Sequence, residues 1–317
     1  MPAASRQRIV VTGAGGFVGG HVLHTILAAD DPPEAVWALD LAVPGGPQDD
    51  RIRWLACDVT DPRAVSAAMS EARPDGVIHL VGIARGDDLD AFFRINVAAC
   101  QNVLSAASGL ARPPRVVVIG SAAEYGITTG RDVVVREDRP LLATTTYGLT
   151  KVMQEQWALA YAREKHLPVV CVRPFNIIGP GQPTGLVPAA FLRQVADVVA
   201  GRSDVVRVGN TATHRDFVDV RDVAAAIWAL LQAGSDVDGE VFNIASGQPV
   251  KIADILQACI DLSGREIPVE EDPARQKAVD VRSIVGDISR IQAATSWEPN
   301  MPWRRSLKEM WRDLCIP

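Results

Sequence analysis

Residues 9–40 read IVVTGAGGFVGGHVLHTILAADDPPEAVWALD, and this stretch decides the fold. An apolar run of strand type precedes Gly13, Gly16 and Gly19, and an apolar helical pattern from Val18 onward follows the glycine turn. Such a turn lets backbone N–H groups approach a pyrophosphate, which the positive end of the helix also attracts. The stretch therefore predicts a dinucleotide site.

Asp40 ends the second predicted strand. A carboxylate at that place can accept hydrogen bonds from both hydroxyls of an adenosine ribose. Because strand, turn, helix and acid follow one another in the expected register, a glycine-rich turn without a ligand is the weaker interpretation.

Apolar strands alternate with helical patterns beyond this stretch. We expect strands at 53–55, 76–82, 115–119 and 167–173, and helices at 62–72, 87–108 and 146–165. This alternation predicts an α/β fold of the Rossmann type, a doubly wound parallel sheet with helices on both faces. Residues 121–146 contain no long periodic run and are expected to form a loop with short strands.

The composition of the chain changes after Pro174. Residues 175–188, FNIIGPGQPTGLVP, contain three prolines and three glycines. We therefore predict a dinucleotide-binding domain at 1–174 and a smaller C-terminal α/β substrate lobe at 175–317. Residues 215–245, with a late strand at 241–245, are expected to return to the main sheet.

Composition excludes several classes of protein. The net charge of −6 and the lack of a Lys/Arg cluster argue against nucleic acid as a partner. The five cysteines are odd in number and have no metal-ligand spacing, so we expect neither a disulfide framework nor a metal site. No apolar run is long enough for a membrane helix, and MPAASRQR is too short and polar for a signal peptide. These features favour a cytoplasmic protein without a membrane partner.

Tyr147 and Lys151 form the second informative pattern. Residues four apart share one face of a helix, so the phenol and the ammonium are expected to face the same space. A nearby ammonium stabilises phenolate, and we expect it to lower the pKa of Tyr147. Such a tyrosine can exchange a proton with an alcohol or a carbonyl. Ser121 directly follows the end of the strand at 115–119 and is expected nearby.

An ordered series of motifs resembles the extended short-chain dehydrogenase/reductases that act on nucleotide sugars. The resemblance covers essentially the whole chain. It is carried by TGAGGFVG (12–19), Asp40, Asp58, HLVG (79–82), RINVAA (94–99), GSAAEYG (120–126), YGLTK (147–151), RPFNIIGPGQ (173–182), RDFVDVRDVA (215–224) and TSWEP (295–299). In the second half, SGQPVKI (246–252) and residues 271–291 look most like GDP-4-keto-6-deoxy-mannose reductases.

The resemblance implies roles for individual residues. The catalytic residues would be Ser121, Tyr147 and Lys151, with Asn96 as a supporting polar residue. Cofactor-binding residues would be Gly13, Gly16, Phe17, Val18, Gly19, Asp40, Asp58, Val59, Leu80, Val81, Gly82 and Pro174. Substrate-binding residues would be Arg85, Asn176, Leu186, Val187, Arg215 and Lys277. Two alternatives remain: Asn96 only ties a helix to a loop, and Arg215 only pairs with Asp216 or Asp219.

Asp40 favours NAD(H) over NADP(H), because it would repel a 2′-phosphate and no arginine follows it directly. Lys277 stands in the late motif where an arginine usually grips the substrate diphosphate, and it lacks the bidentate fork.

Departures from the family pattern narrow the reaction. Sugar 4,6-dehydratases carry Asp-Glu after the catalytic Ser/Thr, whereas this chain has Ala122 and Ala123. Glu124 comes one place too late, and strand or loop alternation would turn it away. A dehydratase is therefore disfavoured.

The resemblance favours a 4-keto-sugar reductase that transfers hydride between NAD(H) and C4 of a nucleotide-diphosphate sugar. The alternative is a 4-epimerase with tightly bound NAD, and a UDP-glucuronate decarboxylase and a non-catalytic NAD(H) sensor rank behind it.

The resemblance also implies a homodimer through a four-helix bundle of the helices at 87–108 and 147–165. Their outer faces are expected to be rich in alanine (Ala98, Ala99, Ala106, Ala107, Ala158, Ala160 and Ala162).

Overall fold

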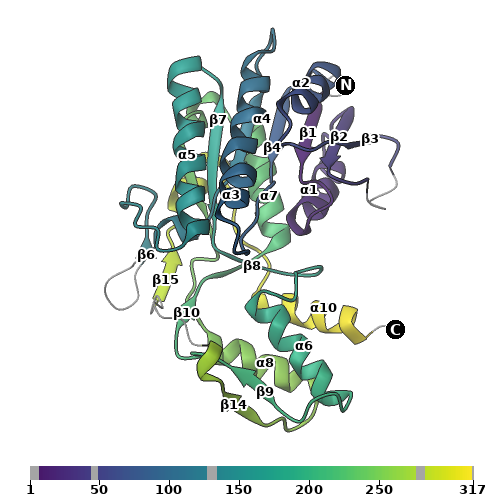
Figure 1. Cartoon of the computed structure of the whole chain (residues 1–317), viewed down its shortest axis with the longest axis vertical. Coiled ribbons are helices and arrows are strands. Elements are labelled where there is room, and N and C mark those ends of the chain that lie inside the picture. Colours follow the sequence, from purple (N-terminus) through teal and green to yellow (C-terminus); the bar gives the residue numbers. More distant parts are fainter. Residues whose placement is uncertain (1–6, 44–48, 127–133, 276–282, 316–317) are drawn as a thin grey trace.

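The computed structural model describes residues 7–43, 49–126, 134–275 and 283–315. Figure 1 shows a central sheet flanked by helices, with a smaller helical lobe beneath it. Within the described residues the central sheet has seven strands, all parallel. From edge to edge they are β12 (Val241–Ile244), β7 (Val169–Pro174), β5 (Arg115–Ile119), β4 (Gly76–His79), β1 (Arg8–Thr12), β2 (Ala35–Asp40) and β3 (Ile52–Ala56).

Helices cover both faces of this sheet, because alternate side chains of a strand point to opposite faces. In β1, Ile9 and Val11 join one apolar core, whereas Val10 joins the core on the other face. The first face is covered by α1 (Phe17–Leu27), α7 (Val220–Gln232) and α9 (Ser289–Thr295), and the second by α2 (Pro62–Ala72), α4 (Ala99–Ser108) and α5 (Thr146–Lys165). The predicted doubly wound parallel sheet is confirmed.

The winding of the sheet reverses beside β1. The strands β2 and β3 lie on one side of β1, and β4, β5, β7 and β12 lie on the other. In open parallel sheets, ligands bind at such a switch point, outside the carboxyl ends of the strands. Because Gly13 directly follows β1, the sequence places the glycine turn at this position.

The helix expected at 87–108 has three segments. They are α3 (Leu89–Phe92), a π-helical turn η1 (Phe93–Ala98) and α4. The wide turn contains Asn96, whose carboxamide is fixed by hydrogen bonds to Ile83 and Thr150. Such single π turns inside helices are frequent at functional sites.

The lobe has its own apolar core, to which α6 (Val187–Val199), α8 (Ile252–Ser263) and α10 (Trp303–Cys315) contribute. Short strands lie in the lobe and between it and the sheet: β6 (Val134–Val135), β8 (Asn176–Ile178), β9 (Val206–Val208), β10 (His214–Arg215), β11 (Phe217–Asp219), β13 (Val250–Lys251), β14 (Val269–Glu271) and β15 (Ser283–Gly286). Three 3₁₀ turns complete the described elements: η2 (Ala122–Glu124), η3 (Ser235–Val237) and η4 (Pro273–Arg275).

The chain passes from the lobe back to the sheet. The strand β12 pairs in parallel with β7, and α7 packs against the same core as α1. The proposed domain boundary at residue 174 stays a prediction. Among the described helices, none has both the length and the apolar character that crossing a membrane requires.

Candidate active site

The glycine turn brings α1 close to β1. Gly13 has a φ of +70°, a conformation that residues with a Cβ rarely adopt. A Cβ on Gly19 would collide with the carbonyl oxygen of Gly13, so the helix can approach the turn only with glycine there. Gly16 offers no side chain to cap α1, which leaves N–H groups of the first helical turn available to an anion.

A cavity of about 450 Å³ lies against this turn, and we call it the glycine-turn cavity. Asp40 lines it at the carboxyl end of β2, and its carboxylate accepts hydrogen bonds from the backbone N–H groups of Gly15 (2.9 Å) and Leu41 (2.8 Å). The Asp58 carboxylate is held by the N–H and hydroxyl groups of Thr60 (2.9 and 2.8 Å). The backbone N–H groups of the glycine turn and the carboxylate of Asp40 suit the diphosphate and the adenosine ribose of a dinucleotide such as NAD(H).

The predicted cofactor residues fall into three groups. The glycine-turn cavity is lined by Gly13, Gly16, Asp40, Asp58, Val59, Leu80, Val81 and Gly82. The adjoining cavity is lined by Phe17, Val18 and Pro174, and again by Leu80 and Gly82. Gly19 is buried beneath the turn, where its role is packing.

The adjoining cavity, of about 480 Å³, contains Ser121, Tyr147 and Lys151, and we call it the tyrosine cavity. Thr145 caps α5 by accepting a hydrogen bond from the N–H of Gly148 (3.0 Å), which places Tyr147 in the first helical turn. The Ser121 side chain lies close enough to the Tyr147 phenol to lower its pKa. The structure thus brings the three predicted catalytic side chains together.

Lys151 is almost completely buried. Its ammonium group donates to the carbonyl oxygen of Ile119 (2.8 Å) and to Oε1 of Gln154 (2.9 Å). Burial disfavours the charged form and lowers the pKa of Lys151 to about 8, whereas negative charges on Glu124 and Cys100 would act in the opposite direction.

The pKa of Tyr147 lies above its usual value, so the expected lowering is wrong. Burial of the phenol raises this pKa, the interaction with the Ser121 side chain lowers it, and a negative charge on Glu124 would raise it. The ammonium of Lys151 is engaged by Ile119 and Gln154, and its proximity does not outweigh burial. A protonated phenol is the form that can donate a proton.

Asn96 joins the loop after β4 to α5. Its side chain accepts from the N–H of Ile83 (2.8 Å) and donates to the carbonyl of Ile83 (2.9 Å) and the hydroxyl of Thr150 (2.9 Å). Asn96 is completely buried, and these contacts match the alternative in which it ties a helix to a loop.

Ala122 and Ala123 line the tyrosine cavity at the position of the dehydratase acids. Of the described residues that line this cavity, none carries a carboxylate. Glu124 is turned inward, but a 3₁₀ turn rather than strand alternation directs it: its Oε1 accepts from the N–H of Ser121 (2.6 Å).

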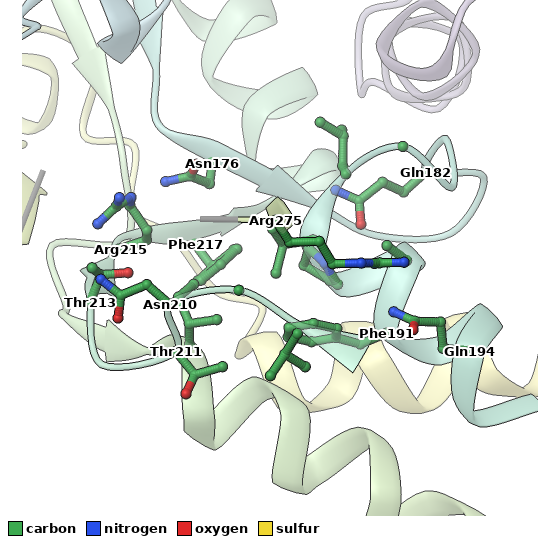
Figure 2. Close-up of a pocket in the computed structure, with 18 of the residues that line it drawn as sticks. Asn176, Gln182, Phe191, Gln194, Asn210, Thr211, Thr213, Arg215, Phe217 and Arg275 are labelled. Atoms are coloured by element: carbon green, nitrogen blue, oxygen red, sulfur yellow. The ribbon is translucent and has the colours of Figure 1, made fainter. Parts of the chain in front are cut away.

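A third cavity, of about 400 Å³, lies between the sheet and the lobe, and we call it the lobe cavity (Figure 2). Asn176, Leu186 and Arg215 line both this cavity and the tyrosine cavity, so the two are continuous. Arg85 and Val187 line the lobe cavity alone, and Arg85 also donates to the carbonyl of Gly185. Lys277 lies outside the described residues.

Asp216 and Asp219, the alternative partners of Arg215, accept hydrogen bonds from other groups. Asp216 accepts from the backbone N–H groups of Ser246, Gly247 and Gly286. Asp219 accepts from Arg221 (2.8 Å) and from the hydroxyl of Ser306 (2.6 Å).

Several residues of the site were not predicted from the sequence. Gln154 fixes Lys151, and its spacing of three residues on the same helix was an available signal. Gln194, Arg207 and Arg275 line the lobe cavity. They come from α6, β9 and η4, and Figure 2 shows Gln194 and Arg275 converging on it from different segments. No local pattern links those segments.

The comparisons with known proteins agree with this geometry. The chain is 31% identical over 312 residues to GDP-6-deoxy-D-mannose reductase of Pseudomonas aeruginosa, with 97% of each chain covered. It is 26% identical to UDP-glucose 4-epimerase of Azospirillum brasilense, covering 96% of this chain and 94% of that one. The solved structure of RMD from Pseudomonas aeruginosa complexed with NADPH has a TM-score of 0.83 and 29% identity, with 97% and 98% covered.

Residues 9–245, from β1 through β12, match the NAD dependent epimerase/dehydratase family. This range includes the glycine turn, Ser121, Tyr147, Lys151 and Arg215. The chain therefore belongs to the NAD dependent epimerase/dehydratase family.

Proposed function

We propose that this protein is an NAD(H)-dependent reductase that acts on the 4-keto group of a nucleotide-diphosphate sugar. One observation carries the proposal: Ser121, Tyr147 and Lys151 meet in a cavity that adjoins the glycine-turn cavity on one side and the lobe cavity on the other. A sugar in the tyrosine cavity would lie between the cofactor and its own nucleotide.

The residues of the tyrosine cavity suit reduction. When bound, the nicotinamide of NADH supplies the hydride. Tyr147, with its raised pKa, holds the proton that the forming alkoxide needs. The hydroxyl groups of Ser121 and Tyr147 stabilise the developing oxyanion. The positive charge of Lys151 stabilises negative charge at the same end of the cavity.

The lobe cavity suits a nucleoside diphosphate. Its described lining includes four arginines (Arg85, Arg207, Arg215 and Arg275) and no carboxylate. Arginine forks match phosphate oxygens, so Arg215 and Asn176, at the junction with the tyrosine cavity, would hold the diphosphate. The similarity to GDP-6-deoxy-D-mannose reductase favours GDP as the nucleotide and a 6-deoxy sugar.

The first experiment offers NADH and a GDP-4-keto-6-deoxy sugar to the purified protein. We expect NADH to be oxidised stoichiometrically with formation of the 4-hydroxy product. Tyr147→Phe should lower turnover by about 100-fold or more, the range of general acid catalysis, while the Kd of NADH stays close to the wild-type value. Equal turnover by Tyr147→Phe would contradict the assignment.

A 4-epimerase is the second candidate, because the chain is also similar to a UDP-glucose 4-epimerase. In that case the protein would purify with bound NAD and would interconvert two 4-epimers without added reductant. Mass analysis of co-purifying nucleotides, followed by an assay without NADH, separates the two reactions.

The proposal extends to the assembly. We propose a homodimer formed by α3, η1, α4 and α5 of two chains, because these segments expose apolar side chains on one side of the sheet: Leu89, Phe93, Leu149 and Trp157. The expected alanine-rich face is smaller than predicted, since Ala99, Ala107 and Ala158 are buried in the core against the sheet. The cytoplasmic location stays a prediction.

A further inference from the structure

A group of buried charged side chains lies behind Ser121, outside the three cavities. Glu124 is completely buried at the end of η2. Its Oε1 accepts from the N–H of Ser121 (2.6 Å), while Oγ of Ser121 accepts from the N–H of Ala123 (3.1 Å). Together these contacts form a capping box that fixes the backbone of the catalytic serine.

The other carboxyl oxygen of Glu124 has no hydrogen-bond partner among the described residues. Oε2 is buried and lies 3.6 Å from Nε of Arg173, beyond hydrogen-bond distance. The guanidinium of Arg173 instead forms a two-pronged bond with Glu155 (2.8 and 2.7 Å), and both of these side chains are also buried. Two buried carboxyl groups therefore share one cation, and Glu155 holds it.

An ionised Glu124 would be a buried anion to which neither Arg173 nor Lys151 donates a hydrogen bond, which is strongly disfavoured. Protonation removes this charge and gives Oε2 a hydrogen to donate. Glu155 is a close neighbour that raises the pKa of Glu124, so its carboxylate is the group that can accept this hydrogen. The arrangement resembles other pairs of close carboxyl groups, of which only one ionises.

We propose that Glu124 is a positioning residue that, as a neutral carboxylic acid, holds the Ser121 backbone and leaves the charge of Lys151 uncompensated beside Tyr147. This inference rests on the proposed function of Ser121, Tyr147 and Lys151. It assigns a task to a residue outside the cavities that hold substrate and cofactor.

The electrostatics agree with the geometry. Burial, and then the neighbouring Glu155, raise the pKa of Glu124 well above its usual value, although Arg173 and the Ser121 N–H group act in the opposite direction. A negative charge on Glu124 would raise the pKa of Tyr147 and of Lys151. The titratable or charged groups that surround it are Tyr147, Lys151 and Glu155 of α5, Cys171 and Arg173 of β7, and Tyr125 beside it in the chain.

Gly120 makes room for this arrangement. A Cβ at Gly120 would collide with Oε1 of Glu124 and would lie 2.9 Å from the carbonyl oxygen of Val172. The Glu124 side chain therefore occupies the space that a side chain at residue 120 would need. The glycine before Ser121 and the glutamate after it form one unit.

The test compares Glu124→Gln, Glu124→Ala and Glu155→Gln, and it reads the pKa of Tyr147 by ultraviolet titration. Each variant is measured against its own Tyr147→Phe counterpart, which is practical because the chain has only three tyrosines. Glutamine is neutral and keeps both hydrogen bonds, so Glu124→Gln should leave the pKa of Tyr147 at its wild-type value. Glu155→Gln should release Arg173, ionise Glu124 and raise the pKa of Tyr147 by about 1 unit or more. The double variant Glu124→Gln/Glu155→Gln should have the wild-type pKa of Tyr147.

Two further readouts separate positioning from stability. Infrared difference spectra should show a carboxylic-acid C=O band at neutral pH in the wild-type protein and its loss in Glu124→Gln. Glu124→Ala should lower kcat by about 100-fold, the effect of misplacing a reacting group by about 1 Å, with the KM of NADH little changed. The kcat of Glu124→Gln should be at least tenfold higher than that of Glu124→Ala, since glutamine keeps the hydrogen bond to the Ser121 N–H group.

A wild-type spectrum without this band, or a lower Tyr147 pKa in Glu124→Gln, would overturn the proposal. The titration and the spectra need no nucleotide sugar. If the wild-type protein reduces no nucleotide sugar but both readouts behave as expected, then the proposed function fails while the neutral Glu124 stands.

Discussion

Lys151 is an ammonium group that folding transfers from water into the protein interior. Its folded pKa of about 8 lies below the unperturbed value of 10.5, so between these values the unfolded chain binds more protons than the folded one. The free energy of unfolding must therefore rise with pH across this window. We expect the wild-type protein to gain up to about 3 kcal/mol relative to Lys151→Met between pH 7 and pH 10.

Urea unfolding of both proteins at several pH values measures this difference. The comparison is made within each protein across pH, so that the hydrogen bonds lost from Ile119 and Gln154 cancel. Parallel stability curves for the two proteins would contradict the lowered pKa.

We propose that Asp40 decides between NADH and NADPH. Its carboxylate lies in the glycine-turn cavity, where it would face a 2′-phosphate, although the similar RMD structure contains NADPH. We expect Asp40→Asn to raise the ratio of kcat/KM for NADPH to that for NADH by about tenfold, corresponding to about 1.4 kcal/mol of relieved repulsion. Steady-state kinetics with both cofactors measures the ratio.

Asp58→Asn is the matched control for this change. Asp58 lines the same cavity, but its carboxylate is held by Thr60 and is expected to face the adenine. The cofactor ratio of Asp58→Asn should stay near the wild-type value. An equal shift in both variants would mean that Asp40 acts only through the net charge of the cavity.

At the scale of single elements, α1 offers two adjacent glycines with opposite surroundings. A Cβ at Gly19 would collide with the Gly13 carbonyl, whereas a Cβ at Gly20 would meet nothing within 4 Å. Gly19→Ala should therefore push α1 away from the turn, lowering the melting temperature and weakening NADH binding. Gly20→Ala should stabilise the protein by about 0.5–1 kcal/mol, the propensity gain of alanine in a helix.

Thermal unfolding and fluorescence titration with NADH test this pair. Similar melting temperatures and NADH affinities for the two variants would show that close packing of α1 on the turn has no consequence for the cofactor.

Elements with a local cause were predictable from the sequence. The strand–turn–helix unit at 9–40, the cap of Asp61 with Pro62 at the start of α2, and the helix that begins at Thr146 follow from short-range patterns. The π turn at Asn96 was not predictable, because its partners Ile83 and Thr150 are distant in sequence. The same holds for Glu124, whose inward direction depends on the 3₁₀ turn and on contacts with β7 and α5.

The candidate site was likewise predictable only where a local motif marks it. Ser121, Tyr147 and Lys151 carry a motif, and the structure joins them in one cavity. The raised pKa of Tyr147 depends on burial, which the motif does not encode. The arginines of the lobe cavity come from four separate segments, and only the fold of the whole chain assembles them.

At the scale of the whole molecule, the remaining question is how the exposed apolar side of α5 is covered. Leu149 and Trp157 are eight residues apart on one face of α5 and are 53% and 43% exposed, and Phe93 of the neighbouring π turn is 47% exposed. Exposed apolar groups that cluster on one side of a protein mark interaction surfaces. A second copy of the chain, related by a twofold axis, would cover this side with the same side chains.

We expect sedimentation velocity at micromolar concentration to give a particle of twice the chain mass of 34.0 kDa. Trp157→Glu should convert it to a monomer with its cofactor affinity retained, because Trp157 is not among the residues that line the three cavities. Val269→Glu is the control, since Val269 is equally exposed (42%) but lies on β14 of the lobe, away from α5. If the wild-type protein is a monomer, or if Val269→Glu also dissociates the dimer, then the apolar side of α5 is not the dimer interface.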